Sequence, residues 1–274
     1  MFDPEDEFLS MQKLEDCVAD IRKWMSANFL KLNDDKTELL FLGTPQNLAK
    51  LTLTTVQIGG STIVSSSHVH NIGAMFDPQL KMNIQVSSAC KSAWYRLYQI
   101  GKIRPLYLTA DQTKSIIHAY VTSKLDQNNS LLIGCPDVLI NRLQKVQNAA
   151  AKLIFRASKY DHVTILLKEL HWLPLNQRIV FKILLLTFKA LHGQGPQYLC
   201  ESLTWHKPSR SLRSSNDLLL VVPKTRLKTY GDRAFRAVAP RLWNDLPLSL
   251  RQSPSTNSFK TNLKTYLFKN VYDV

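Results

Sequence analysis

The feature that most constrains this fold is a repeat of apolar side chains every three or four positions through much of the chain after residue 80. This spacing places apolar side chains on one face of an α-helix, which packs against other elements. In residues 136–156 the apolar face consists of Leu139, Leu143, Val146, Ala150 and Leu153. The pattern therefore predicts that the region after residue 80 is mainly helical.

The same criterion predicts helices at residues 6–28, 82–102, 109–124, 136–156, 162–170, 174–192 and 255–272. Thr109 and Gln112 have the spacing of a capping box, and Gly193 is suited to end a helix. The apolar face of the first helix is predicted to contain Phe8, Met11, Leu14, Val18, Ile21 and Met25.

Short apolar runs predict strands at 37–42, 51–58, 61–64, 69–75 and 218–222, with Gly59-Gly60 as a hairpin turn and a loop at 204–217. The predicted fold class is α+β, mostly α. A small antiparallel sheet with one helix would occupy residues 1–80. A basic helical region at 81–200 and a mixed region at 201–274, ending in a helix, would follow.

The charge of the chain is unevenly distributed. The 274 residues carry 35 Lys and Arg against 21 Asp and Glu, a net charge of +14. Residues 1–80 hold 6 bases and 11 acids, whereas residues 81–274 hold 29 bases and 10 acids. This surplus favours a polyanionic partner for the region after residue 80.

The four cysteines, Cys17, Cys90, Cys135 and Cys200, form no CxxC pair. This spacing argues against a zinc ribbon and favours four buried thiols in a reducing compartment. The sequence contains no apolar stretch long enough for a bilayer, and its acidic start is unlike a signal peptide. We therefore expect a soluble intracellular protein, nuclear or cytoplasmic, with no membrane partner.

Several segments resemble one protein family. Trp24 precedes the pattern N-x-L-x-L-N-x-x-K-T-E at residues 28–38. Five further segments carry the resemblance. They are NIGAMFDPQL (71–80), NRLQKVQNAAAKLI (141–154), LHWLPLNQRIVFKI (170–183), FRAVAPRLWNDLP (235–247) and FKTNLKTYLF (259–268). In this order they resemble the C-terminal part of the reverse transcriptases of non-LTR (LINE-type) retrotransposons, in the jockey-like clades.

The resemblance implies a fragment of an RNA-directed DNA polymerase: the palm end at 1–80, the thumb at 81–200 and the C-terminal region at 201–274. Its partner would be an RNA template with a DNA primer. In the intact family, palm carboxylates bind two divalent metal ions such as Mg²⁺. The family's aromatic-x-Asp-Asp box would lie upstream of Met1. We therefore expect this chain alone to be inactive, with no cofactor, metal site or small-molecule substrate, and Asp34-Asp35 to form a solvated turn.

The resemblance also suggests roles for three residues in the first 80. Lys36 matches a lysine proposed to protonate the leaving pyrophosphate, although it could simply be a surface lysine that begins an edge strand. Gly73 and Asp77 match the primer grip, in which a glycine allows the backbone to approach the primer terminus. The alternative for Gly73 is an ordinary turn glycine.

Basic residues of the later regions are candidates for sequence-tolerant contacts with phosphates. They are Lys91, Arg96, Lys102 and Arg104 on or near the predicted helix 82–102, Arg142, Lys145, Lys152 and Arg156 on the predicted helix 136–156, and Lys207, Arg210, Arg213, Arg226, Lys228, Arg233 and Arg236 in the C-terminal region. Trp94, Tyr95 and Tyr98 interleave with the first group. Core packing is the favoured interpretation of these aromatics, and base stacking is the alternative.

Other patterns leave alternatives open. His68 and His70 would share a face of a strand, but no third metal ligand is evident. Gln127 and Asn128 stand where relatives usually carry an aromatic residue and a cysteine, which is either harmless or a sign of drift. A non-enzymatic nucleic-acid-binding or interaction module is the main alternative function, and an inert gene-model fragment is another.

Overall fold

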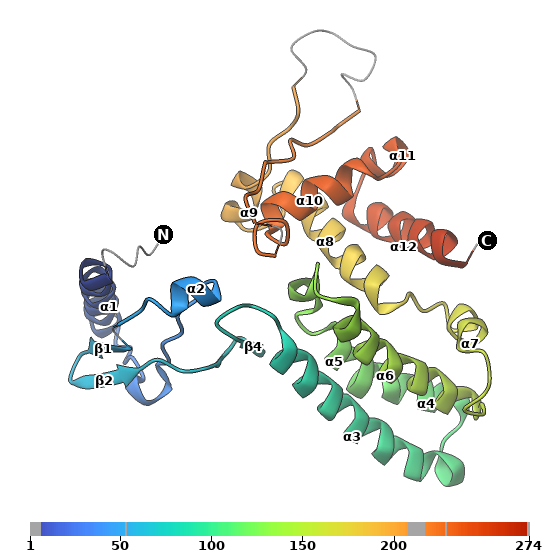
Figure 1. Cartoon of the computed structure of the whole chain (residues 1–274). Coiled ribbons are helices and arrows are strands. Elements are labelled where there is room, and N and C mark those ends of the chain that lie inside the picture. Colours follow the sequence, from blue (N-terminus) through green and yellow to red (C-terminus); the bar gives the residue numbers. More distant parts are fainter. Residues whose placement is uncertain (1–6, 53, 208–216, 228, 273–274) are drawn as a thin grey trace. The chain divides into compact units, whose positions relative to one another are not determined.

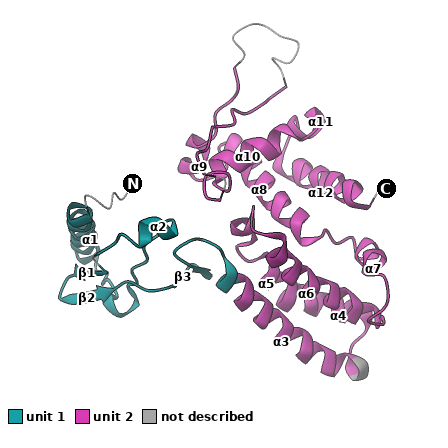
Figure 2. Ribbon diagram, in the orientation of Figure 1, with its two compact units in different colours: residues 1–85 teal, residues 86–274 magenta. Residues whose placement is uncertain are grey.

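The computed structural model describes residues 7–52, 54–207, 217–227 and 229–272 (Figure 1). The chain forms two compact units, Met1–Gln85 and Val86–Val274 (Figure 2). The described residues are mainly helical and include two small antiparallel sheets of two strands each. The predicted fold class, α+β and mostly α, is therefore confirmed.

The first unit contains one long helix and two hairpins. Its elements are α1 (Glu7–Ala27), the 3-10 turn η2 (Asp34–Lys36), α2 (Pro45–Leu48), β1 (Thr55–Ile58), β2 (Ser61–Val64), β3 (Val69–Asn71) and β4 (Ala74–Phe76). Strand β1 pairs with β2, with Val56 opposite Ile63, and β3 pairs with β4. The turn between β1 and β2 places Gly59 at a φ of 63°, as predicted for a glycine turn.

Two strand predictions in this unit are wrong. Residues 69–75 form the second hairpin rather than one strand, because the chain reverses at Ile72 and Gly73, with φ values of 47° and 78°. Residues 37–42 contain only an isolated bridge, between Leu39 and Ser65. An apolar run predicts burial, but a strand also needs a neighbour with free backbone groups along its length.

Helix α1 forms where it was predicted, but most of its predicted apolar face is not buried. Met11 is buried with Val56 and Ile58 of β1. Phe8 is 76% exposed and Ile21 is 46% exposed. The small hairpins of this unit therefore cover only a part of the apolar face of α1.

In the described part of the second unit, all regular elements are helices or helical turns. Its elements are α3 (Asn83–Tyr107, beginning just before the unit boundary), α4 (Ala110–Ile117), the π-helix η3 (His118–Thr122), α5 (Ser123–Asp126), the 3-10 turn η4 (Asn129–Leu132), α6 (Asp137–Phe155), α7 (Val163–Glu169), α8 (Leu175–Leu191), α9 (Gln197–Glu201), α10 (Phe235–Asn244), α11 (Leu248–Arg251) and α12 (Thr256–Tyr272). Among the described residues, no helix is both long and apolar enough to cross a bilayer.

Local capping signals explain several helix ends in this unit. Thr109 and Gln112 form the predicted capping box at the start of α4. The predicted helix 109–124 continues through a π turn at 118–122 to Asp126. Pro136 precedes the first turn of α6 as its N-cap, and Gly193 follows α8 with a φ of 65°.

The core near the C-terminus joins α8, α10 and α12, which lie together in Figure 1. The ring centroids of Phe188 and Phe259 are 4.3 Å apart, and Trp243 packs 5.9 Å from Phe259. The sequence patterns did not predict α10. Because α8 and α10–α12 share this core, the predicted regions 81–200 and 201–274 lie in one unit. The predicted strand at 218–222 is only an isolated bridge from Leu220 to Trp205.

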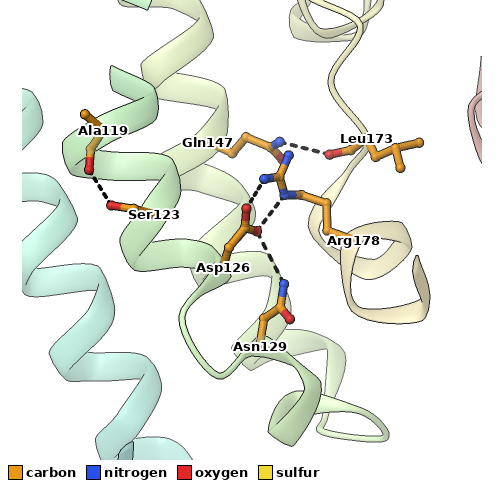
Figure 3. Close-up of polar contacts among 7 residues, drawn as sticks. All are labelled: Ala119, Ser123, Asp126, Asn129, Gln147, Leu173 and Arg178. Carbon is orange, nitrogen blue, oxygen red and sulfur yellow. Dashed lines mark hydrogen bonds and ion pairs between the residues drawn. The ribbon is translucent and has the colours of Figure 1, made fainter. Parts of the chain in front are cut away.

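A polar network joins α5 to α8 (Figure 3). The Asp126 carboxylate accepts hydrogen bonds from Nε and a terminal nitrogen of Arg178 and from the side-chain amide of Asn129. The Gln147 amide donates to the Leu173 carbonyl at 2.9 Å. A bidentate ion pair fixes the orientation of both partners as well as their separation.

We expect Asp126→Asn to lower the free energy of unfolding by about 1–3 kcal/mol. Breaking a fully buried ion pair costs roughly 3–5 kcal/mol, and this pair is partly exposed. Urea denaturation measures the change. The matched control is Glu169→Gln, which removes one exposed carboxylate and should change stability by less than about 0.5 kcal/mol. Equal effects of the two variants would contradict the role of the network.

All four cysteines are reduced thiols, but the prediction that all four are buried is wrong. Cys90 and Cys135 are buried, Cys200 is partly buried and Cys17 is exposed. Burial raises the pKa of the Cys90 thiol, although the nearby charge of Arg142 opposes this shift. A raised pKa reduces the thiolate fraction, so Cys90 acts as a core residue rather than as a nucleophile.

Candidate nucleic-acid interface

Helix α3 has two stripes of side chains, one buried and one exposed. Its buried stripe follows a spacing of three and four residues and consists of Val86, Cys90, Ala93, Leu97, Ile100 and Arg104. Another stripe faces solvent and consists of Lys91, Trp94, Tyr95, Tyr98 and Lys102. Residues 83–107 include no Asp or Glu. The exposed stripe of α3 is therefore both cationic and aromatic, and the helix itself contains no acidic residue to offset its charge.

The favoured interpretation of the three aromatics as core residues is wrong. Trp94, Tyr95 and Tyr98 are 45%, 58% and 60% exposed. Helical spacing alone could not distinguish these aromatics from core residues. Trp94 and Tyr98 are four residues apart, as are the buried residues Ala93 and Leu97. Aromatic rings in water beside cations are the arrangement used to stack bases of single-stranded nucleic acids.

Cations lie over two of these rings. The Lys102 ammonium is 4.5 Å from the Tyr98 ring centroid. The Arg96 guanidinium is 5.8 Å from the ring centroids of both Tyr95 and Tyr120. Such contacts hold long side chains against the helix without neutralising them. The cations therefore remain available to an approaching phosphate.

Helix α6 lies beside α3 and runs in the same direction. Arg142 donates to the Ser87 hydroxyl near the start of both helices, and the Arg104 guanidinium donates to the Ile154 carbonyl near their ends. Arg142 and Lys145 are exposed, and Arg156 is exposed at the C-cap of α6. Lys152 is half-buried and donates to the Lys159 carbonyl. We call the exposed cations and rings on the shared side of these two helices the α3–α6 face: Lys91, Trp94, Tyr95, Tyr98, Lys102, Arg142, Lys145 and Arg156. Arg96, which reaches Tyr120 of η3, and the half-buried Lys152 are not part of it.

Two further residues that were predicted to bind phosphates instead bind backbone carbonyls of the protein itself. Arg104 is only 6% exposed, and its 2.7 Å hydrogen bond to Ile154 joins α3 to α6. Arg233 donates to the carbonyls of Leu131 and Ile133, so its guanidinium holds the turn before α6. Charge counts treat all arginines alike, but a guanidinium with five donors is also well suited to bind carbonyls inside a protein.

Three of the remaining C-terminal candidates lie within the described residues. Lys207, Arg226 and Arg236 are exposed. Arg210, Arg213 and Lys228 lie outside the described residues.

The candidates of the first unit have local structural roles. Lys36 is exposed at the end of η2 rather than at the start of a strand. Asp34, in the same turn, forms a 2.6 Å ion pair with Arg22 of α1, so this carboxylate is not simply solvated as predicted. Gly73 lies in the β3–β4 turn, which matches its alternative as a turn glycine.

The Asp77 carboxylate orders the segment that leads into α3. It accepts hydrogen bonds from the backbone amides of Gln79, Lys81 and Met82 at 2.8–3.2 Å. Met82 has a φ of 63°, a strained value that these bonds stabilise. In the segment resembling the primer grip, Asp77 thus orients backbone rather than presenting a free carboxylate.

The described residues contain no group of three His, Cys, Asp or Glu side chains that could bind a metal ion. His68 and His70 are both exposed. His68 Nδ1 lies 3.0 Å from the Ser67 hydroxyl, and the His70 backbone amide donates to Glu38.

We expect Trp94→Ala and Tyr98→Ala each to weaken binding of a single-stranded overhang by about 5- to 100-fold, because base stacking contributes roughly 1–3 kcal/mol per base. Binding of a blunt duplex should change little, since its bases are not available for stacking. Fluorescence anisotropy with both substrates measures the difference. Tyr198→Ala, at a ring that is 70% exposed on α9, is the control. An equal loss for both substrates would contradict a stacking role.

The comparisons with known proteins do not supply an identity: no family model, curated protein or solved structure matches the chain.

Proposed function

We propose that this chain is the palm-end, thumb and C-terminal part of a LINE-type reverse transcriptase and that it binds the backbone of a primer–template duplex through the α3–α6 face. The observation that carries the proposal is this face, where exposed cations and rings lie on two adjacent parallel helices. Among the described residues, Lys91, Lys102 and Lys145 form no ion pair. Cations without a protein partner release counterions when they bind phosphates.

In this proposal, the chain alone binds nucleic acid but does not catalyse DNA synthesis. The sequence has no aromatic-x-Asp-Asp box. Asp34 is paired with Arg22, and the Asp77 carboxylate is used by backbone amides. These carboxylates are poor candidates for the palm ligands that bind two metal ions.

A salt titration of binding to an RNA–DNA hybrid tests the proposal. With about five phosphates contacted, log affinity should fall against log salt with a slope of about −4.5, or roughly 500-fold between 50 and 200 mM. No binding at the lower salt concentration would overturn the proposal. Primer extension with Mg²⁺ or Mn²⁺ should yield no product, and any templated synthesis would contradict the expected inactivity.

A non-enzymatic nucleic-acid-binding module is the second candidate. The local roles of Gly73 and Asp77 favour it, because neither side chain needs a primer terminus to explain its position. The two candidates differ in their preferred substrate. A reverse transcriptase part should bind a duplex with a recessed primer end more tightly than a blunt duplex of the same length. A general binding module should bind both equally.

A further inference from the structure

A concave site lies within the helical unit, in a cavity of about 430 Å³. Helix α8 contributes Arg178 and Lys182, and α12 contributes Lys260 and Lys264. Each pair is four residues apart, so both pairs project from one face of their helix. His118, Asn129 and Trp172 also line the cavity. A cavity of this size is typical of small-ligand sites.

The charge of this cavity is strongly positive. It has four cationic side chains and one carboxylate, Asp126, which is already bound by Arg178. Among the described residues, Lys182, Lys260 and Lys264 form no ion pair. Like charges four residues apart destabilise a helix, so folding alone does not favour this arrangement. A concave surface with one sign of charge concentrates its field on an anion inside it.

The field of these cations also affects a neighbouring histidine. The pKa of His118 is lowered by desolvation first and then by the charges of Arg178 and Lys114, against the opposing effect of Asp126. Lys264 lowers it further. The imidazole therefore tends to remain neutral at pH 7 and can donate one hydrogen bond.

Two buried polar atoms in the cavity wall have no hydrogen-bond partner in the described part of the chain. They are Nε1 of Trp172 and Oδ1 of Asn129, whose residues are 5% and 3% exposed. Unpaired buried polar groups are rare in native proteins, and such groups often mark a place for water or a ligand. They place an unpaired donor and an unpaired acceptor in the wall beside the cations.

We propose that this cavity binds a small organic phosphate of about mononucleotide size. A phosphomonoester carries nearly two negative charges, which matches three unpaired lysines better than a single carboxylate does. The apolar walls formed by Trp172, Phe181 and Leu185 would contact the organic part. A nucleic-acid duplex is too wide to enter the cavity. The sequence had given no reason to expect such a ligand.

The proposal is tested by calorimetry of the full chain with AMP at about 50 mM salt, compared with adenosine. The test variant is Lys182→Gln/Lys264→Gln, which removes one lysine from each helix. The control is Lys189→Gln/Lys269→Gln, which makes the same charge change on the same two helices outside the cavity wall. Thermal melting checks that both variants fold.

AMP should bind the wild-type chain and the control alike, and the test variant should bind at least about tenfold more weakly. Equal binding of adenosine and AMP, equal losses in the two double variants, or no binding of millimolar AMP would overturn the proposal. Competition with an oligonucleotide distinguishes the source of the phosphate. A 5′-phosphorylated strand should displace AMP better than an unphosphorylated one, and equal displacement would indicate a backbone groove instead.

Discussion

Exchanging Lys91, Lys102 and Lys145 for glutamate should lower the affinity for a duplex by on the order of a hundredfold or more at physiological salt. Each exchange removes a cation from the α3–α6 face and places a carboxylate next to the phosphates. The salt slope should also become shallower by about 2.7 units, since roughly 0.9 unit is lost for each phosphate contact. Fluorescence anisotropy across a salt series measures both quantities.

The control for this experiment carries the same change in charge at other lysines. Lys13, Lys31 and Lys50 are exposed lysines of the first unit. Their exchange for glutamate should leave the salt slope within about one unit of the wild-type value. If the two triple variants lose affinity equally, binding depends on net charge alone and the α3–α6 face is not the interface.

Trp243→Ala should lower the free energy of unfolding of the helical unit by about 3–5 kcal/mol. The Trp243 side chain is fully buried, and its ring packs beside Phe188 and Phe259. Its Nε1 donates to the Leu218 carbonyl at 2.8 Å, so the substitution also removes a hydrogen bond. A loss of this size is a large fraction of the stability of a typical domain.

Chemical denaturation followed by circular dichroism measures this change, because helices dominate the second unit. Trp94→Ala is the matched control, since it deletes the same side chain from an exposed position on α3. It should change stability by less than about 0.5 kcal/mol while weakening binding of single strands. Equal destabilisation by the two variants would contradict the assignment of Trp243 to the core and Trp94 to the surface.

The sequence predicted most of the long helices because their signals are local. Periodic apolar residues, the Thr109 capping box and Gly193 act within a few positions of each helix end. It failed on the strand at 37–42 and on the missed α10, whose structures depend on distant partners. The strand lacks a neighbour to pair with over its length, whereas α10 is stabilised by burial of Trp243 among residues of α8 and α12.

The candidate interface shows the same division between local and tertiary information. The sequence by itself determined that α3 is a helix with many bases, no acids and three aromatics in its middle. It did not determine which side faces water. Lys102 is exposed, whereas Arg104, two residues later, is buried against the Ile154 carbonyl. Only the position of α6 made that difference, because the burial of a helical side chain depends on the elements that pack on its face.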